Sequence, residues 1–314
     1  MTSPIKRVAI VGTGVIGASW AAAFLASGLD VSANDVAPGA EVRLRKYISE
    51  AWPALEQLGL AKDASRERLT FSGDLETAVK SADLVQENGP EKIEFKRGLY
   101  EHLDALLDAN VIIASSSSGL TMGSIQSACT KHPERCVIGH PFNPPHLIPL
   151  VEIVGGALTS EDTIERATRF YRSLGKKTIR LRKEVPGHVA NRLQAALFRE
   201  VVHLIAEGVV SVEDADAAVS WGPGLRWGVM GPTMLFNLGG GEGGIAHFLE
   251  QFTGPMNALW SALGSPVLTP ELCAMIAQGA TEELHNRPFA QLVSERDEVL
   301  LGLLALRNQE FVAP

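Results

Sequence analysis

Short runs of apolar and β-branched residues alternate with amphipathic helical patterns along the first part of the chain. Eight such runs have the length and composition of strands, at residues 6–11, 30–35, 68–72, 83–87, 111–115, 136–140, 149–154 and 177–182. Strands that alternate with helical segments predict an α/β domain with a parallel sheet and helices on both faces. Residues 38–62 carry a helical pattern that Trp52-Pro53 interrupts, so we expect a helical hairpin that projects from the sheet.

The pattern changes at Pro186-Gly187, after which the strand signals stop. Apolar residues from 189 to 208 recur at helical spacing, and a glycine ends the run. We therefore predict an α/β domain at residues 1–186 and an all-α domain at residues 187–314.

Further signals divide the second domain. Ser211 and Thr269 have the residue type and context of helix N-caps, and residues 289–311 predict a long terminal helix. The Gly/Pro-rich stretch 222–244 is expected to be a functional loop because of its length.

The first predicted strand runs directly into a glycine-rich turn. In this G-x-G-x-x-G pattern the first glycine allows a tight turn, the second lets a pyrophosphate approach bare backbone, and the third lets the next helix pack close to the strand. The positive end of that helix faces the phosphates. We therefore predict a Rossmann-type, doubly wound parallel sheet that binds a dinucleotide. The predicted contacts are Gly12, Gly14, Val15, Ile16 and Gly17.

A carboxylate at the end of the second predicted strand selects the cofactor. Asp35 lies 23 residues after Gly12, where the ribose 2′-hydroxyl of a dinucleotide needs an acceptor. Its charge would repel a 2′-phosphate, and residues 36–38 place no basic side chain beside it. NAD is therefore the expected cofactor, rather than NADP.

Composition limits the partners and the compartment. The 314 residues carry a net charge of −8, so neither nucleic acid nor an anionic membrane is expected as a partner. No apolar run reaches the roughly 18 residues that span a bilayer, and the first strand begins too early for a signal peptide. Cys129, Cys136 and Cys273 form no C-x-x-C motif and no even disulfide set. These features favour the reducing cytoplasm.

A histidine and a glutamate stand in two consecutive predicted strands. His140 ends the strand at 136–140, and Glu152 lies inside the apolar run at 149–154. A carboxylate in an apolar strand is costly to bury unless it is paired, and it raises the basicity of a neighbouring imidazole. The pair can supply a general base for the oxidation of an alcohol. Taken alone, however, a single His–Glu pair is more often structural than catalytic.

Serines at positions 115 to 118 follow the fifth predicted strand, at the carboxyl edge where open α/β sheets bind ligands. No G-x-S-x-G motif is present, so a serine nucleophile is not expected. The histidines show no metal-binding spacing such as H-E-x-x-H, so no metal site is expected. His188 lies three positions before Asn191, on what we expect to be one helix face.

Several motifs occur in the order typical of one enzyme family. Besides the glycine-rich turn they are Ser-Ser-Gly-Leu at 117–120, His-Pro-Phe-Asn-Pro at 140–144, Leu-Val-Glu at 150–152 and Pro-Gly-His-Val-Ala-Asn-Arg at 186–192. With these motifs the chain resembles the 3-hydroxyacyl-CoA dehydrogenase superfamily over nearly its whole length. Two family motifs are altered, because Asn-Thr-Ser-Ser reads Ser-Ser-Ser-Gly here and His-Phe-Phe-Asn-Pro reads His-Pro-Phe-Asn-Pro.

The resemblance implies roles for individual residues. His140 would be the catalytic base and Glu152 its partner. Ser118 and Asn191 would hydrogen-bond the substrate oxygen and the catalytic histidine. The implied positions near the cofactor are Glu91, Lys96 and Ser116. The resemblance also implies a homodimer formed through the helical domain.

Three motifs point to one branch of the superfamily: Gly-Ala-Ser-Trp at 17–20, His-Pro at 140–141 and Gly-Leu-Arg-Trp at 224–227. That branch holds λ-crystallin, which is L-gulonate 3-dehydrogenase, and L-carnitine dehydrogenase, and its members act on free acids. We therefore expect an NAD-dependent enzyme of the L-gulonate 3-dehydrogenase type, acting on a free L-3-hydroxy acid. The alternatives are L-carnitine dehydrogenase, 3-hydroxyacyl-CoA dehydrogenase, and a crystallin-like structural protein without catalytic duty.

Charge also favours a free acid as substrate. A site for CoA needs Lys or Arg for its phosphates, yet the tip of the expected hairpin, residues 49–60, has two acids and no base. Arg226, in the Gly/Pro-rich stretch, could bind a substrate carboxylate through two hydrogen bonds. Aromatic residues that could contribute to a cage for a quaternary ammonium, which keeps carnitine open, are Trp52, Trp221, Trp227 and Phe236.

Overall fold

The computed structural model describes residues 5–308. The chain divides into two compact units, residues 1–192 and 193–314, which we call the sheet unit and the helical unit. The domain boundary expected after residue 186 stays a prediction.

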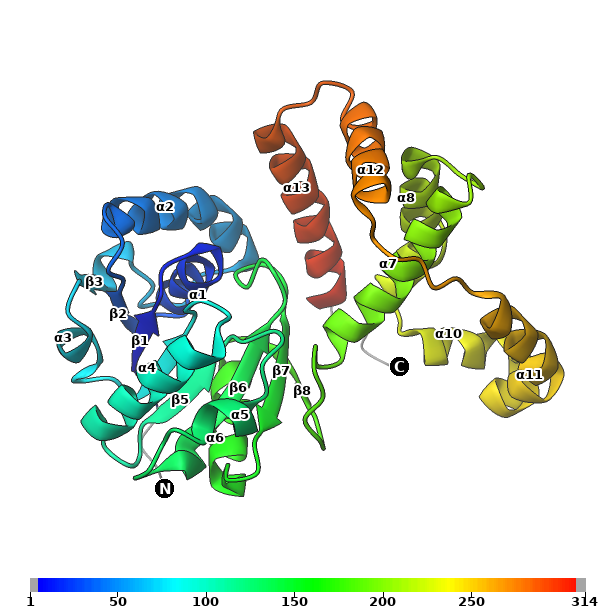
Figure 1. Ribbon diagram of the computed structural model, residues 1–314. Coiled ribbons are helices and arrows are strands. Elements are labelled where there is room, and N and C mark those ends of the chain that lie inside the picture. Colours follow the sequence, from blue (N-terminus) through cyan, green and yellow to red (C-terminus); the bar gives the residue numbers. More distant parts are fainter. Residues whose placement is uncertain (1–4, 309–314) are drawn as a thin grey trace. The chain divides into compact units, whose positions relative to one another are not determined.

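The sheet unit is built on one sheet with the strand order β3-β2-β1-β4-β5-β6-β7-β8 (Figure 1). The order reverses between β1 and β4, which is the crossover of a doubly wound fold. Each observed strand overlaps a predicted run, and the predicted α/β fold class is confirmed. Within the described residues the strands are Arg7–Val11 (β1), Asp30–Asn34 (β2), Leu69–Ser72 (β3), Leu84–Glu87 (β4), Ile112–Ser115 (β5), Cys136–Pro141 (β6), Leu150–Gly155 (β7) and Lys177–Arg180 (β8).

One strand of the sheet runs against its neighbour. β7 pairs antiparallel with β6, whereas β8 is parallel to β7. Residues 142–149 connect β6 to β7 without a helix. A parallel pair would need a crossover of roughly a dozen residues or more, so this short connection permits only the antiparallel arrangement. The parallel sheet expected from the pattern is therefore corrected to a mostly parallel one.

Alternate residues of β1 face two separate hydrophobic cores. Val8 and Ile10 belong to a cluster with α1, α2 and α6, whereas Ala9 and Val11 belong to a cluster with α4 and α5. Helices therefore cover both faces of the sheet (Figure 1). They are Val15–Ala26 (α1), Ala40–Leu58 (α2), Leu75–Val79 (α3), Ile93–Leu106 (α4), Met122–Gln126 (α5) and Glu161–Ser173 (α6), with 3-10 turns at Arg66–Arg68 (η1) and Pro133–Arg135 (η2).

The helical hairpin expected at residues 38–62 is not formed. α2 runs unbroken with Pro53 inside it, and Leu44, Ile48, Trp52 and Leu55 are buried in the cluster that contains α1. Burial of a large apolar side chain contributes about 1.5–3 kcal/mol. Four such side chains outweigh the roughly 3 kcal/mol that a proline costs inside a helix. Because Trp52 is buried in this packing, it cannot line a ligand cage.

The helical unit contains most of α7 and all later helices. The bounds are Ala190–Ala206 (α7), Val212–Trp221 (α8), Pro223–Trp227 (α9), Pro232–Gly239 (α10), Gly241–Gly243 (η3), Gly244–Ala262 (α11), Pro270–Glu283 (α12) and Phe289–Asn308 (α13). The predicted N-caps are confirmed, because the Ser211 and Thr269 side chains accept hydrogen bonds from backbone amides of α8 and α12. Of the terminal helix expected at 289–311, the last three positions lie outside the described residues.

The stretch 222–244 is not the loop that its composition predicts. It forms α9, α10 and η3, with Pro223 and Pro232 at the first helical positions. A proline there loses no hydrogen bond, because the first amides of a helix have no partner within it. Arg226 therefore lies in the last turn of α9 rather than in a loop.

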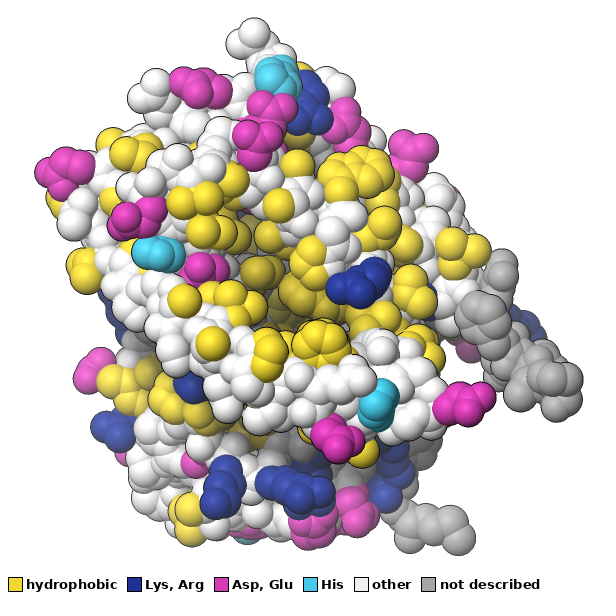
Figure 2. Space-filling model, turned by 90° about the vertical axis from the view of Figure 1, so that its right-hand side faces the viewer, with side chains coloured by type: hydrophobic (Ala, Val, Ile, Leu, Met, Phe, Trp, Pro, Cys, Tyr) yellow, Lys and Arg dark blue, Asp and Glu magenta, His cyan; other side chains and the backbone are white. Residues whose placement is uncertain are grey.

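Few apolar side chains of the helical unit are buried. Among its described residues the buried hydrophobic ones are Val202, Ile205 and Ala215, whereas Trp221 is 80% exposed and Trp260 is 63% exposed. The face drawn in Figure 2 carries a broad area of hydrophobic side chains around a hollow. Exposed apolar areas of this kind mark interaction surfaces. In the described part of the chain, none of the helices has the length and apolar character needed to cross a membrane.

Candidate active site

The carboxyl ends of β1, β2, β4 and β5 meet at one edge of the sheet, and backbone hydrogen bonds join the turns that follow them. The Gly12 amide donates to the Asn34 carbonyl at 2.9 Å, and the Asn88 amide to the Val11 carbonyl at 2.7 Å. The Ser116 amide donates to the Glu87 carbonyl at 2.8 Å. This edge is where open α/β sheets bind their ligands.

The glycine-rich turn has the shape that a dinucleotide requires. Gly12 has a φ of +87°, and a Cβ at Gly17 would lie 1.9 Å from the Gly12 carbonyl oxygen, so glycine is needed at both positions. A Cβ at Gly14 would meet open space, and no side chain caps the amides of α1 at this residue. The bare backbone at the positive end of α1 therefore fits a pyrophosphate.

Asp35 directly follows β2, and hydrogen bonds fix its carboxylate beside the glycine-rich turn. Oδ2 accepts from the amide and the hydroxyl of Thr13, both at 2.8 Å, and Oδ1 accepts from the Ala37 amide at 2.9 Å. Burial would raise the pKa of Asp35, but these hydrogen bonds and the nearby Arg43 charge lower it overall. The ionised carboxylate keeps lone pairs that fit a ribose hydroxyl.

The antiparallel pairing of β6 and β7 sets His140 directly opposite Glu152. Nδ1 of His140 lies 2.8 Å from Oε2 of Glu152, and the two residues are 5% and 0% exposed. An ionised carboxylate can only accept a hydrogen bond, so Nδ1 carries the proton and Nε2 keeps its lone pair. The imidazole can therefore take up a proton at Nε2.

The other oxygen of Glu152 holds the start of α7. Oε1 accepts from the amides of Val189 at 2.9 Å and Ala190 at 3.1 Å. Burial would raise the pKa of Glu152, but the hydrogen bond from His140 and these two amide bonds lower it overall. Glu152 is therefore ionised at neutral pH, and it fixes the helix turn that carries Asn191.

Glu91 shapes the turn after β5. Its Oε1 accepts from the Ser117 hydroxyl at 2.6 Å and from the amides of Gly119 and Leu120 at 2.8 Å and 3.1 Å. Ser118 lies between these anchored residues, and its side chain is exposed. The turn therefore presents Ser118 at the carboxyl edge, while a direct contact of Glu91 with the cofactor stays a prediction.

The side chains of Ser116 and Lys96 form hydrogen bonds with other side chains of the protein. The Ser116 hydroxyl donates to the Asn88 side chain at 2.7 Å and accepts from the Gln86 side chain at 2.8 Å. Lys96 is 1% exposed and donates to both carboxylate oxygens of Glu87, at 2.8 Å and 2.9 Å. The cofactor contacts expected of Ser116 and Lys96 stay predictions.

Glu87 is a buried residue of the site to which the sequence pattern assigned no role. It ends β4, is 0% exposed, and accepts from the Ser115 hydroxyl and the Gly89 amide at 2.6 Å each, besides Lys96. It thereby ties the ends of β4 and β5 to α4. The available signal was a charged residue that closes an apolar strand, since a buried carboxylate must find partners.

His188 does not lie on the helix face where spacing predicted it. It precedes α7 and has a φ of +51°, next to Gly187 at +77°. Two consecutive left-handed residues form a turn, so the helical spacing from His188 to Asn191 does not apply. The His188 ring is buried, with its centroid 5.0 Å from that of His140.

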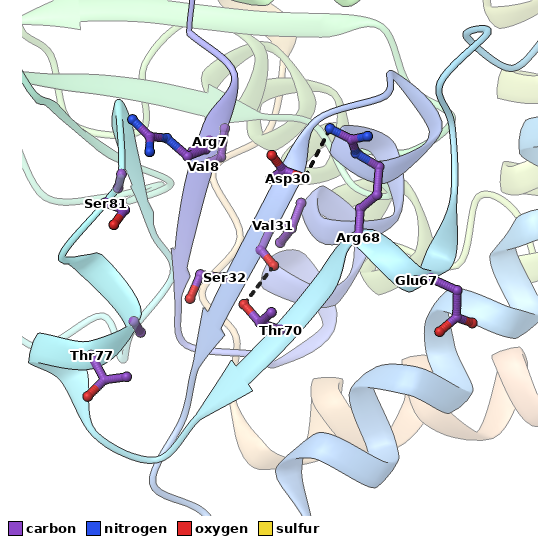
Figure 3. Close-up of a pocket in the computed structure, with 12 residues that line it drawn as sticks. Arg7, Val8, Asp30, Val31, Ser32, Glu67, Arg68, Thr70, Thr77 and Ser81 are labelled. Atoms are coloured by element: carbon purple, nitrogen blue, oxygen red, sulfur yellow. Dashed lines mark hydrogen bonds and ion pairs between the residues drawn. The ribbon is translucent and has the colours of Figure 1, made fainter.

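A separate cavity of about 490 Å³ lies near the amino-terminal ends of β1 to β3. Arg7 and Asp30 at its rim begin β1 and β2, and Arg68 pairs with Asp30 at 3.0 Å (Figure 3). Because parallel strands begin at the edge opposite the glycine-rich turn, this cavity is not the dinucleotide site. Within the described residues, no cluster of three or more His, Cys, Asp or Glu side chains could hold a metal ion.

Two family models match the chain. The NAD binding domain of 3-hydroxyacyl-CoA dehydrogenase matches residues 7–185, and the C-terminal domain of the same enzyme matches residues 187–281. The chain belongs to the 3-hydroxyacyl-CoA dehydrogenase family. It is an NAD-dependent oxidoreductase that acts on a CH–OH group, and the expected cofactor is confirmed.

Similar proteins place the chain in the L-carnitine dehydrogenase branch of this family. It is 51% identical over 300 residues to the L-carnitine dehydrogenase of Streptomyces griseus, covering 96% of this chain and 89% of the relative. The L-carnitine dehydrogenase of Pseudomonas putida is 46% identical, with 96% and 93% covered. A solved structure of 5-formyl-3-hydroxy-2-methylpyridine 4-carboxylic acid 5-dehydrogenase, an NAD+ dependent dismutase, matches with a TM-score of 0.84 and 32% identity, covering 98% of this chain and 100% of that one.

Proposed function

We propose that the protein oxidises the 3-hydroxyl of L-carnitine to the 3-oxo acid with NAD. The observation that carries the chemistry is the 2.8 Å contact between His140 and Glu152 at the dinucleotide-binding edge. The similarity to L-carnitine dehydrogenases supports the substrate. These relatives favour the carnitine alternative over the L-gulonate expectation.

His140 acts as the general base in this proposal. Its Nε2 takes the hydroxyl proton, because Nδ1–H is held by Glu152. NAD, when bound, supplies the acceptor for the hydride that leaves the same carbon. The ionised Glu152 stabilises the imidazolium that forms. The Ser118 hydroxyl and the Asn191 side chain hydrogen-bond the reacting oxygen, as the family resemblance implies.

The substrate itself carries a carboxylate and a quaternary ammonium. Arg226 is exposed and forms no ion pair with the residues that the structure describes, so its guanidinium is free to bind the carboxylate. Trp221 and Trp227 expose aromatic faces in the same unit, at 80% and 38%. Such faces attract quaternary ammonium groups, which supports carnitine over a sugar acid.

The decisive experiment measures NADH formation with L-carnitine, L-gulonate, a short aliphatic L-3-hydroxy acid and one 3-hydroxyacyl-CoA ester. We expect the highest kcat/KM for L-carnitine, by about tenfold or more, because only this acid carries both a carboxylate for Arg226 and a quaternary ammonium for the aromatic faces of Trp221 and Trp227. A higher kcat/KM for the CoA ester would replace the proposal with the acyl-CoA alternative. NAD binding without turnover of any acid would favour the crystallin-like structural protein.

We also propose a homodimer formed through the helical unit. The described residues of this unit bury few hydrophobic side chains, and many large ones lie exposed on it. A second copy of the chain would cover this surface symmetrically. Sedimentation equilibrium should give twice the mass of one chain, whereas a monomer at every concentration would exclude the dimer.

A reducing cytoplasm fits the cysteines. Cys129 and Cys136 are buried and form no disulfide, although their sulfurs share a hydrogen bond at 3.7 Å, and Cys273 is an exposed free thiol. Exposed free thiols are poorly suited to oxidising compartments. We therefore propose a cytoplasmic location, which fractionation of the native host can test.

A further inference from the structure

His188 occupies a strained and buried position that the proposed mechanism does not use. Its φ of +51° lies in the left-handed region, which L side chains rarely adopt, and the residue is 2% exposed. Strain of this kind persists only where surrounding contacts require it, and it concentrates at functional sites. The contacts of His188 therefore indicate what it does.

The His188 ring makes one hydrogen bond through a defined nitrogen. Nε2 lies 2.9 Å from the Ser117 carbonyl oxygen. A carbonyl can only accept, so Nε2 carries the proton and Nδ1 is an acceptor. This Nδ1 is buried and has no hydrogen-bond partner among the described residues. The hydrogen bond to Ser117 is therefore the one that the His188 ring makes within the described residues, and its other nitrogen is left unsatisfied.

The Ser117 carbonyl controls the direction of Ser118. The carbonyl of residue 117 and the amide of residue 118 belong to one planar peptide unit. The remaining polar groups of Ser117 are also held, because its amide donates to the Ser115 hydroxyl at 3.1 Å and its hydroxyl donates to Glu91 at 2.6 Å. The hydrogen bond from His188 therefore completes the fixation of the peptide that leads into Ser118.

The same histidine is tied to the His140–Glu152 pair. Its own amide donates to the Val185 carbonyl at 3.1 Å, and the next two amides, of Val189 and Ala190, bind Glu152. Its ring centroid lies 5.0 Å from that of His140. The turn at residues 188–190 thus contacts His140, Glu152 and the turn after β5 that carries Ser118, which we call the serine turn.

Burial, more than the surrounding charges, keeps the His188 ring neutral. Burial lowers the pKa of His188, against the raising effects of the Ser117 carbonyl and of the Glu152 and Glu91 charges, while His140 lowers it further. A neutral ring beside His140 adds no positive charge to oppose the imidazolium that forms there during the reaction.

We infer that His188 is a positioning residue, which holds Ser118 and the His140 ring in register around the reacting oxygen through its hydrogen bond to Ser117 and its contact with His140. The inference rests on the proposed function, which assigns the reaction to His140 and Ser118. The sequence pattern placed this side chain on a helix face, whereas in the structure it lies in the turn before α7.

Two variants separate the hydrogen bond from the ring. His188→Phe keeps a ring but removes the donor, whereas His188→Gln places an amide donor near the position of Nε2. We expect His188→Phe to lower kcat about 10–100-fold with an unchanged Kd for NAD, since small misplacements of reacting groups have effects of this size. His188→Gln should stay within about threefold of the parent kcat, because the donor to Ser117 is retained. A parent-like kcat for His188→Phe, or equal losses in both variants, would overturn the inference.

A double variant and a matched control complete the kinetic test. If His188 acts through the serine turn, His188→Phe should add little to the loss caused by Ser118→Ala, whereas effects that multiply would contradict that route. His102→Phe and His102→Gln, at a half-exposed position on α4, should leave kcat unchanged. Should His188→Phe fail to fold, His188→Asn takes its place, because asparagine tolerates a left-handed φ but has a shorter side chain.

The ring nitrogens provide a readout that does not depend on the substrate. In ¹⁵N NMR of histidine-labelled protein, the His188 signal, identified by its loss in His188→Gln, should show the proton on Nε2. A proton on Nδ1 together with normal turnover of L-carnitine would refute the inference alone. The Nε2–H form without turnover of any 3-hydroxy acid would refute the proposed function and, with it, the catalytic part of the inference.

Discussion

At the scale of single residues, the sheet unit is organised by buried charges that satisfy one another. Glu152 binds His140 and two backbone amides, and Glu87 binds Lys96, a hydroxyl and an amide. An unpaired charge in these positions would cost several kcal/mol, so each buried carboxylate gathers partners from several elements. The resulting precision of position is what base catalysis requires.

Removing the base is the direct test of the proposed chemistry. His140→Ala should lower kcat about 10²–10⁴-fold, because the hydroxyl proton loses its acceptor. Glu152→Gln should lower kcat within the same range of about 10²–10⁴-fold, because the imidazolium loses its counter-charge and Nδ1–H its fixed acceptor. Steady-state NADH formation measures both effects, with Glu165→Gln on the exposed face of α6 as control. Near-normal turnover of His140→Ala would remove the base assignment.

A second prediction concerns stability and pH. Asp104 and Arg135 form a buried ion pair at 3.0 Å, with 2% and 1% of each residue exposed. Burial would raise the pKa of Asp104, but the Lys131 amide, Arg135 and the His132 amide lower it overall. A carboxyl whose pKa is depressed by folding stabilises the protein above its unfolded pKa of about 4, and this contribution is lost as the pH falls through the folded pKa.

Asp104→Asn should therefore destabilise the protein by about 3–5 kcal/mol at neutral pH, because Arg135 is left buried without a counter-charge. The difference from the parent chain should shrink in acid, where Asp104 is protonated in both folded and unfolded states. Urea denaturation at neutral and acidic pH measures the two differences. Equal differences at both pH values would contradict the linkage of Asp104 to folding.

At the scale of elements, two glycines at the junction of β1 and α1 are there for different reasons, one for packing and one for ligand binding. A Cβ at Gly17 would collide with the Gly12 carbonyl oxygen at 1.9 Å, whereas a Cβ at Gly14 would meet nothing. Gly17 is therefore required by the contact between α1 and β1. Gly14 is required only by a ligand that approaches the turn from solvent.

The two alanine variants should consequently behave differently. Gly17→Ala should destabilise the fold by about 1–3 kcal/mol, the usual effect of forcing extra atoms into a packed contact. Gly14→Ala should leave Tm unchanged and weaken NAD binding about tenfold or more, because the methyl group would occupy the position of the pyrophosphate. Thermal denaturation and calorimetric titration with NAD give both values. If Gly14→Ala bound NAD normally, the cofactor would not lie on this turn.

At the scale of the whole molecule, the two units differ in how they bury apolar surface. The sheet unit holds two continuous hydrophobic cores, one on each face of the sheet. The described residues of the helical unit leave large side chains such as Trp260, Leu268 and Phe289 exposed, at 63%, 58% and 81%. A unit with so little core of its own would gain stability if the proposed dimer covered this surface with another chain.

The proposed dimer therefore predicts a thermal stability that depends on concentration. Because association stabilises the folded chain by mass action, Tm should rise as the protein concentration is increased. Scanning calorimetry over a wide range of protein concentrations measures this rise. A monomeric protein, whose Tm should not change with concentration, serves as the control. A Tm independent of concentration would indicate that the helical unit is stable without a partner chain.

The sequence by itself determined features that depend on neighbouring residues and their spacing. The periodicity located the strands, the spacing of Gly12, Gly14 and Gly17 predicted a dinucleotide turn, and Asp35 favoured NAD as the cofactor. His140 and Glu152 could be paired in advance because both belong to consecutive apolar strands. Each of these inferences needs only the local period of the chain and the chemistry of the side chains in it.

Only the tertiary structure decided features that depend on what a segment packs against. Burial against α1 keeps α2 continuous through Pro53. Glu87 and His188 acquire their partners from elements far away in the sequence. A local pattern carries no record of such neighbours, because the free energy that settles these conformations comes from contacts that exist only once the chain has folded.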